Sequence, residues 1–446
     1  MTLSYIGVTQ GADAKILVDS ISNTGYPVSK MILGDAGNDD GLVSKNNPVP
    51  MTLVQSDGGA LFDAFGRLRF SEPLTLFDSK LLYDKNSLVW DEKITNGSGS
   101  ATSIHSTTHA RVRMHVQNND TIIRQTKRRF NYQNGKSTLI FMTTVFGAKT
   151  SGVKKRVGYF DANNGLFFEQ DGSNLKVVIR KNGSDTSINQ SSWNIDKLNG
   201  TGKSEISLDE TKSQIIIIDF EWLGVGRVRF GFVVDGIIYY CHQFLNANVN
   251  DSVYMSVPNL PLRYEISSTS GSSNLDHICS SIISEGGRPE DNIGITRSFS
   301  NGSNGIAANA QHSGYPLVGI RLKSTQLETT IIPYDIQLLS TTSDNFNWRL
   351  CLNPTTTASL SYSGLDNSSV EAAKGQGTIS NYGTVLAEGY FFEKTNLNVN
   401  LPVGLRLGST IDGTRDQLIL AVIPLSNTTT AYGGINWREV IWLMVI

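Results

Sequence analysis

Short apolar stretches run along most of the chain, and turn-forming residues separate them. The stretches are rich in Val, Ile, Phe, Tyr and Thr, and the residues between them are mainly Gly, Asn, Asp and Ser. This pattern is typical of β-sandwiches and barrels. Amphipathic helical periodicity is nearly absent. The sequence therefore predicts an all-β protein.

The clearest local signal lies at 228–244, where Asp235-Gly236 separates two β-rich runs. Asp-Gly is a preferred two-residue hairpin loop, so we expect a tight antiparallel hairpin. Its pairing predicts that Phe230 lies opposite Cys241. The predicted core face comprises Val228, Phe230, Phe232, Val234, Ile237, Tyr239 and Cys241. His242 falls on the opposite face, where we expect contact with solvent.

Similar strands precede and follow this hairpin. Serial antiparallel pairing of this kind predicts a concanavalin-like jelly-roll sandwich over 60–290. The strands expected there, besides the hairpin, are 139–146, 156–161, 166–170, 175–180 and 213–222. A Gly/Ser/Asn-rich stretch at 291–313 is expected to be a linker or exposed loop.

A second β-sandwich is predicted over 314–446. Its expected strands are 318–322, 331–339, 347–352, 389–392, 404–407, 418–422 and 436–446. Trp437 and Trp442 in the last strand each need burial. Residues 1–59 hold short strands broken by Gly and Asp, too little to bury a core, so this segment is expected to dock on a neighbouring chain as an anchor.

Length and charge narrow the class of protein. The chain has 446 residues, enough for two or three domains, with 39% hydrophobic and 17% charged residues and a net charge of −2. Such a neutral surface disfavours nucleic-acid binding, which needs clustered positive charge. The longest apolar run, near 215–218, is far shorter than the roughly 20 residues of a membrane span. The first residues lack the pattern of a signal peptide, so we expect use without export.

Two pairs of acids could carry chemistry. Asp219 and Glu221 lie two apart, so a strand would place both on one face, as in some jelly-roll glycosidases. Such enzymes need two carboxylates roughly 5–9 Å apart across a sugar cleft, and the longer acidic pattern of those hydrolases is missing. Glu169 and Asp171 have the same spacing, but Asp171 precedes a glycine and is explained as a turn residue.

Metal and nucleotide sites are not supported. His105, His109 and His115 share one parity, but four residues along a strand span about 13 Å, too far for one zinc ion. Two Gly-Lys-Ser sequences, at 135–137 and 202–204, lack the glycine of a phosphate loop. The three cysteines, Cys241, Cys279 and Cys351, cannot all pair and are expected to be reduced, buried hydrophobes. We therefore assign no catalytic, cofactor-binding or metal-binding residue and expect no cofactor.

One basic cluster and several aromatic residues leave alternatives open. The cluster comprises Arg124, Lys127, Arg128 and Arg129. It reads as a solvated strand face, and the alternative is a salt-sensitive contact with an acidic neighbouring subunit. The aromatic residues Trp90, Tyr159, Tyr382 and Tyr432 could stack on sugars or pack in a core.

Three stretches resemble structural proteins of tailed bacteriophages, chiefly of the marine and cyanobacterial kind. They are ALFDAFGRLRFSEPLTLFDSKLLYD at 60–84, VGYFDANNGLFFEQDGSNLKVVIR at 157–180 and IIDFEWLGVGRVRFGFVVDGIIYYCHQFLNAN at 217–248. The phrase NTGYPVSKMILGD at 23–35 also looks like a phage virion segment. The central region resembles a concanavalin or laminin-G jelly roll, a fold shared by lectins, glycosidases and inert virion modules, so the fold alone does not give the function.

The resemblance implies a non-enzymatic structural protein of the virion, assembled in the host cytoplasm, either a head fibre or decoration protein or a tail or baseplate component. Its expected partners are other virion proteins and copies of itself, with a trimer if the protein is fibre-like. The alternative is an adhesin of the tail that binds host surface glycans. A third reading is a tail-borne glycan hydrolase that uses Asp219 and Glu221.

Overall fold

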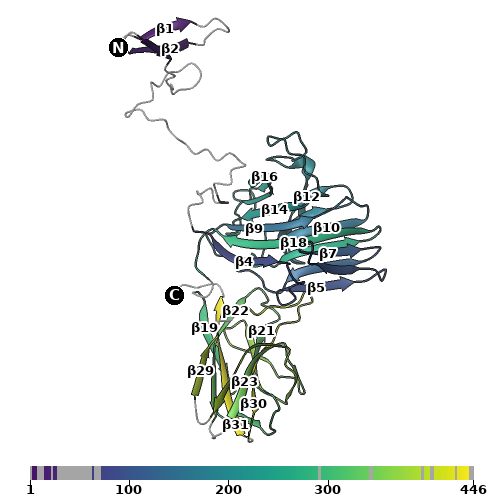
Figure 1. Cartoon of the computed structure of the whole chain (residues 1–446), viewed down its shortest axis with the longest axis vertical. Coiled ribbons are helices and arrows are strands. Elements are labelled where there is room, and N and C mark those ends of the chain that lie inside the picture. The colour runs from purple at the N-terminus through teal and green to yellow at the C-terminus, as the bar shows by residue number, and fades with distance from the viewer. Residues whose placement is uncertain are drawn as a thin grey trace. The chain divides into compact units, whose positions relative to one another are not determined.

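A computed structural model gives the fold of the chain (Figure 1). It describes residues 63–64, 72–289, 293–340, 345–392, 396–401, 406–426 and 429–440, and the backbone of three N-terminal strands. Chain contacts divide the protein into two units, 1–56 and 57–446. The described elements are antiparallel β-strands and one 3-10 helix, η1 (Gln190–Ser192), so the predicted all-β class is confirmed. No described helix is long and apolar enough to cross a membrane.

The N-terminal unit contains a three-stranded antiparallel sheet in the order β1-β2-β3. Its strands are β1 (Leu3–Gly7), β2 (Lys15–Ile21) and β3 (Thr24–Pro27). The short strands predicted for the segment 1–59 are thus present, and residues 28–62 lie outside the described part of the chain. The docking role of this segment stays a prediction.

Two stacked antiparallel sheets form the predicted jelly roll. The seven-stranded sheet runs β5 (Trp90–Thr95), β8 (Thr121–Thr126), β17 (Leu262–Ser268), β10 (Val153–Phe160), β11 (Gly165–Gln170), β12 (Leu175–Lys181), β13 (Ser184–Asn189). The eight-stranded sheet runs β6 (Thr102–Ser106), β7 (Arg111–Val116), β18 (Ser273–Ser284), β9 (Thr138–Val145), β14 (Gln214–Phe220), β15 (Val228–Val234), β16 (Ile237–Phe244), with β4 (Leu74–Lys80) also paired to β18. One core lies between them, where Phe168 of β11 meets Phe230 of β15 edge-on at 5.4 Å.

The predicted hairpin is present, but its register shifts. Asp235 and Gly236 form the turn with φ of 52° and 79°, as a two-residue loop of this type requires. A bulge between Phe230 and Gly231 pairs Phe230 with His242 instead of Cys241. The expectation of a solvated His242 is wrong: the imidazole is buried against Phe244 and accepts a hydrogen bond from the Asn194 amide.

The second sandwich has its own core, in which Trp437 is fully buried as predicted. One sheet comprises β19 (Ile295–Ser300), β31 (Thr429–Val440), β22 (Thr330–Ser340) and β29 (Asn396–Asn400), with β20 (Ile306–Ala308) paired to β31. The other runs β25 (Ser363–Gly364), β26 (Val370–Lys374), β21 (Tyr315–Leu322), β30 (Leu418–Pro424), β23 (Asn345–Leu352), β28 (Thr384–Phe392), and β24 (Thr355–Thr356) pairs with β27 (Ile379–Asn381).

The linker prediction for 291–313 needs correction, and the predictions for Trp442 and part of 404–407 fall outside the described residues. The stretch 291–313 is not simply a linker, because β19 and β20 lie within it and pair with β31. Phe299 of β19 and Ile306 of β20 pack on the second core, which explains why a Gly-rich stretch still forms strands. Trp442 and part of the strand predicted at 404–407 lie outside the described residues.

Candidate functional site

The carboxylate of Asp219 is committed to an ion pair inside the jelly roll. It lies in β14 with no exposed surface and accepts hydrogen bonds from Ser137 Oγ and Tyr240 OH, each at 2.7 Å. The Arg229 guanidinium on β15 pairs with the same carboxylate and lies over the Tyr240 ring at 4.2 Å. Ser137, which ends one of the Gly-Lys-Ser sequences, thus has a structural partner here.

The backbone at Asp63 and Ala64 covers this ion pair. The Ala64 amide donates to Ser137 Oγ at 3.3 Å, and Arg227 donates to the Asp63 and Ala64 carbonyls at 2.9 and 3.1 Å. Both residues belong to the stretch 60–84 that resembles phage virion segments. Backbone from this stretch therefore packs beside the buried Asp219–Arg229 pair.

Glu221 does not share a strand face with Asp219, because β14 ends at Phe220. Its Oε1 accepts the Arg227 amide at 3.0 Å, which folds the side chain over Gly226 within its own turn. The two acids of the hydrolase alternative thus lie on different elements with separate structural partners.

The second acidic pair is also structural. Asp171 accepts the amides of Ser173 and Asn174 in the β11–β12 turn, which confirms the turn interpretation. Burial opposes ionisation of Asp171, but hydrogen bonds from Lys176 and these two amides lower its pKa to about 2. Glu169, directly opposite Arg156 on β10, pairs with that guanidinium at 2.7 Å.

The three histidines do not converge. His105 contacts the Leu81 carbonyl at 2.9 Å, His109 lies 3.0 Å from Ser106 Oγ, and His115 lies 2.9 Å from Asn274. Among the described residues, no three His, Cys, Asp or Glu side chains are placed to hold a metal ion.

The basic cluster is not a solvated face. Arg124 is buried between Glu92, at 2.6 Å, and His277 Nδ1, at 3.0 Å. Its neighbours are partly covered as well, since Arg128 lies over the Phe130 ring and Arg129 pairs with Asp161 at 2.7 Å. The prediction of a solvated face is wrong for Arg124 because alternate residues of β8, such as Ile122 and Arg124, point into the core. Arg128 and Arg129 follow the end of the strand and are covered by their own partners.

The four aromatic candidates divide between core and surface. Trp90 and Tyr159 are buried, and the Tyr159 hydroxyl accepts the Leu260 amide and shares its one proton between the Phe130 and Pro258 carbonyls, at 2.9 and 2.7 Å. Tyr382 and Tyr432 are half-buried on the second sandwich. The Arg349 guanidinium covers the Tyr382 ring at 4.5 Å.

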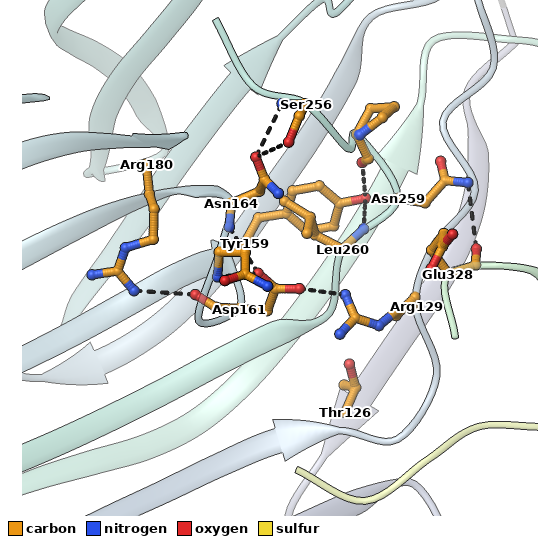
Figure 2. Close-up of polar contacts among 12 residues, drawn as sticks. Thr126, Arg129, Tyr159, Asp161, Asn164, Arg180, Ser256, Asn259, Leu260 and Glu328 are labelled. Atoms are coloured by element: carbon orange, nitrogen blue, oxygen red, sulfur yellow. Dashed lines mark hydrogen bonds and ion pairs between the residues drawn. The ribbon is translucent and has the colours of Figure 1, made fainter. Parts of the chain in front are cut away.

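A polar network at one end of the jelly roll fixes the loop that follows β16 (Figure 2). Asn164 Oδ1 accepts both the amide and the hydroxyl of Ser256, at 3.0 and 2.8 Å. Asp161 orders the turn that carries Asn164 by accepting its amide at 2.8 Å. Two residues earlier in the loop, the Tyr254 hydroxyl donates to the Glu221 carbonyl at 2.6 Å. The loop is thus held by the Asn164 side chain at Ser256 and by the Glu221 carbonyl at Tyr254.

The fixed loop lines a cavity of about 380 Å³ between β12, β13 and the end of β16. Its buried lining includes Ile179 and Tyr254, and its exposed lining includes Asp251, Ser252 and Thr186. Lys181 Nζ donates to Ser252 Oγ at 2.9 Å, and Ser252 Oγ donates in turn to Asp251. Leu245 and Val249 in the same lining are 58% and 73% exposed, unusual for apolar side chains of a tightly held loop.

Sequence reasoning missed this cavity. The stretch 245–254 carries no recognised motif, and the residues opposite come from strands some 60 positions earlier. The density of Asn, Asp and Ser at 246–252 was the only available signal, and it is equally typical of a turn.

No protein-family model and no curated protein matches the chain. Solved structures match about half of it. A glycosyl hydrolase family protein from Mycobacterium fortuitum is 9% identical, with 47% of this chain and 99% of that chain covered and a TM-score of 0.34. A legume lectin-like domain from Entamoeba histolytica is 10% identical (47% and 96% covered, TM-score 0.29), and the Emp47p carbohydrate recognition domain is 9% identical (46% and 94%, TM-score 0.29).

Proposed function

We propose that this chain is a non-enzymatic, carbohydrate-binding recognition protein of a tailed-phage particle. The observation that carries the proposal is the cavity beside the loop after β16, whose lining is held in place by hydrogen bonds that involve no ligand. A site that is already ordered loses less conformational entropy when it binds. The adhesin reading is therefore preferred to the purely architectural one.

The lining has the chemistry that recognises a sugar. Phe244, which is half-buried, and the exposed Leu245 and Val249 offer apolar surface to the C–H face of a pyranose ring. Asp251 and Asn250, both exposed, offer oxygens that can accept hydrogen bonds from neighbouring hydroxyls. Ligand sites usually combine a mostly apolar wall with a few convergent polar groups in this way.

We propose binding without hydrolysis. Glycoside hydrolysis uses two carboxylates that flank the bond to be cut. Asp219 is paired with Arg229 and covered by the chain at Ala64, and Glu221 is engaged in its own turn. Freeing Asp219 would take its carboxylate away from the buried Arg229 guanidinium, at a cost of several kcal/mol.

The place on a phage particle rests on the sequence resemblance of 60–84, 157–180 and 217–248. In this proposal residues 1–59 anchor the chain to other virion proteins, and the two sandwiches present the binding surface. Self-assembly, as a trimer for a fibre, belongs to the same proposal. Deletion of 1–59 should give a folded protein that is missing from purified particles, and normal incorporation would contradict the anchor.

A second candidate, a purely architectural virion component, is favoured by the contacts between the two sandwiches. The Ile411 amide donates to Asp91 at 2.8 Å, and the Ser409 amide donates to the Lys127 carbonyl at 3.1 Å. Asn259 in the first sandwich reaches the Glu328 carbonyl in the second at 3.4 Å (Figure 2). These contacts suit a spacer that bears load and needs no ligand.

Glycan-array binding by the purified full-length protein separates the two candidates, with the oligomeric state checked by light scattering. We expect saturable binding to particular glycans. Asp251→Ala should weaken it at least tenfold, since a charge-assisted hydrogen bond contributes about 1.5–3 kcal/mol. Asp366→Ala, an exposed acid of the second sandwich, is the matched control and should change nothing. A well-folded protein that binds no glycan would favour the architectural role.

A further inference from the structure

We propose a second ligand site, for an uncharged polysaccharide chain, on the outward face of the second sandwich. It is a hollow of about 460 Å³ over β19, β31 and β22. The inference does not depend on the cavity of the jelly roll, because it concerns other strands and another core.

The hollow exists because β31 carries two consecutive glycines at its middle, and only one is required by the fold. A Cβ on Gly433 would lie 2.7 Å from Leu317 Cδ1, so core packing excludes any larger residue there. Gly434 points the other way, and a Cβ there would meet nothing closer than 3.4 Å. Gly434 also lacks a positive φ. A glycine inside a strand weakens it, and such a glycine often marks close approach by a ligand.

Two rows of side chains cross this hollow. Ser300 on β19 and Gln337 on β22 are both opposite Gly434, so a hydroxyl and an amide flank the missing side chain. They are two strand spacings apart, about 10 Å. In the next row, Tyr432 lies opposite Leu339, which is 39% exposed. A polar row beside an aromatic and aliphatic row matches the alternating hydroxyl edge and C–H face of a sugar.

Tyr432, which forms one side of the hollow, is held in place by its neighbours. Buried Asn301 accepts the Gly433 amide at 3.0 Å and donates to the Ala431 carbonyl at 3.0 Å, which extends the sheet beyond the end of β19. The Tyr432 ring rests against Gly305, where a Cβ would come within 3.0 Å of the ring. The ring therefore has little freedom to lose when a ligand stacks on it.

The charge of the lining indicates the class of ligand. No Asp, Glu, Lys, Arg or His is among the described residues that line the hollow. The nearest acid on the same face of β22, Asp335, is buried and bonded to Asn436 at 2.5 Å. Within the described part of the chain, the exposed polar groups of Ser300 and Gln337 have no hydrogen-bond partner. An uncharged ligand with many hydroxyls fits this lining, and a hollow on a sheet face suits the interior of a chain better than its end.

Affinity electrophoresis of the full chain tests the inference, in gels that contain dextran, galactomannan, hydroxyethyl cellulose or, as the acidic comparison, alginate. We expect at least one neutral polymer to retard the protein. Gly434→Val should fill the hollow and abolish retardation, and Tyr432→Ala should weaken binding about tenfold, the equivalent of 1.4 kcal/mol. Matched controls are Ser298→Val, exposed on β19 outside the hollow, and Tyr390→Ala, 72% exposed on β28. Both should be retarded like the parent.

Gln337→Ala keeps the test usable if Gly434→Val folds poorly, because this side chain is exposed and its loss leaves the core unchanged. Asp251→Ala separates this inference from the proposed function. If Asp251→Ala loses neutral-polymer binding while Gly434→Val keeps it, the second site is wrong and the jelly-roll cavity binds the polymer. If Gly434→Val loses neutral-polymer binding and Asp251→Ala keeps it, the second site stands, whatever the glycan array shows for Asp251→Ala. No retardation of the parent in any neutral gel would overturn the inference.

Discussion

The outward faces of the two sandwiches use polar residues in opposite ways. On the seven-stranded sheet of the jelly roll, Arg156 pairs with Glu169 and with Glu265, and Arg180 pairs with Asp185. Beneath them, Phe160 and Phe167 are fully buried under guanidinium groups. On β19, β31 and β22 of the second sandwich, hydroxyl and amide groups border a hollow instead.

This difference shows that many charged residues do not by themselves indicate a site. The jelly roll holds the acids that first suggest catalysis, but Asp219 and Glu169 form ion pairs with arginines of neighbouring strands. Among the described residues, exposed hydrogen-bonding groups lie beside apolar surface in the loop after β16 and in the glycine-centred hollow. Available donors and acceptors, beside apolar surface, are what a ligand can use.

The largest expected effect comes from breaking a buried ion pair of the jelly roll. Asp219→Ala leaves Arg229 buried without its carboxylate, so we expect a loss of about 3–5 kcal/mol in the free energy of unfolding, measured in urea. Glu388→Ala removes the partner of Arg349 at the surface of the second sandwich and should cost less than about 1 kcal/mol. Equal losses would contradict the contrast between the two sandwiches.

The second effect is a pH dependence located in the jelly roll. Burial lowers the pKa of His242 to about 4. The unfolded chain takes up a proton near pH 6.5 and the folded chain does not, so stability should fall as the pH drops from about 6.5 to 4, by up to about 3 kcal/mol. Burial also lowers the pKa of His277, which adds a loss of the same sign.

His242→Gln should therefore flatten the stability curve between pH 6.5 and 4 without removing the slope that His277 contributes. Between about pH 8 and 9, where His242 is neutral in both states, the difference between variant and parent should be constant. Parallel curves across the whole range would show that His242 does not titrate on unfolding.

A smaller effect links the network of Figure 2 to binding. Tyr159→Phe removes a hydroxyl that serves two carbonyls and the Leu260 amide, so we expect a loss of about 1–3 kcal/mol in stability. Because the same network holds the loop after β16, glycan binding at the jelly-roll cavity should weaken as well. Retardation by neutral polymers should be unchanged, since the second hollow lies on another sandwich.

The smallest expected effect concerns the contact between the sandwiches. Asp412→Ala removes an ion pair to Lys93 whose two side chains are 61% and 43% exposed, so it should cost less than about 1 kcal/mol. Asp91→Ala removes the acceptor of the Ile411 amide and should cost somewhat more. Differential scanning calorimetry would compare them, and a large loss for Asp412→Ala alone would contradict this ranking.

The sequence predicted strands well where a turn residue marked their ends, as at Asp235-Gly236. It could not predict the bulge at Phe230, which moved His242 to a buried position, because a bulge depends on packing between two sheets. The two proposed binding surfaces could not be predicted from the sequence for a similar reason. Ser300, Gln337 and Gly434 are distant in the chain and become neighbours only through strand pairing.

The most direct test of the central claim is mass analysis of a glycan before and after it is bound and eluted from the full-length protein. If the protein recognises glycans without cutting them, the eluted glycan should have the mass of the one applied, with no shorter product after long incubation. Shorter products that disappear in Asp219→Asn would contradict the account and make the buried acid catalytic.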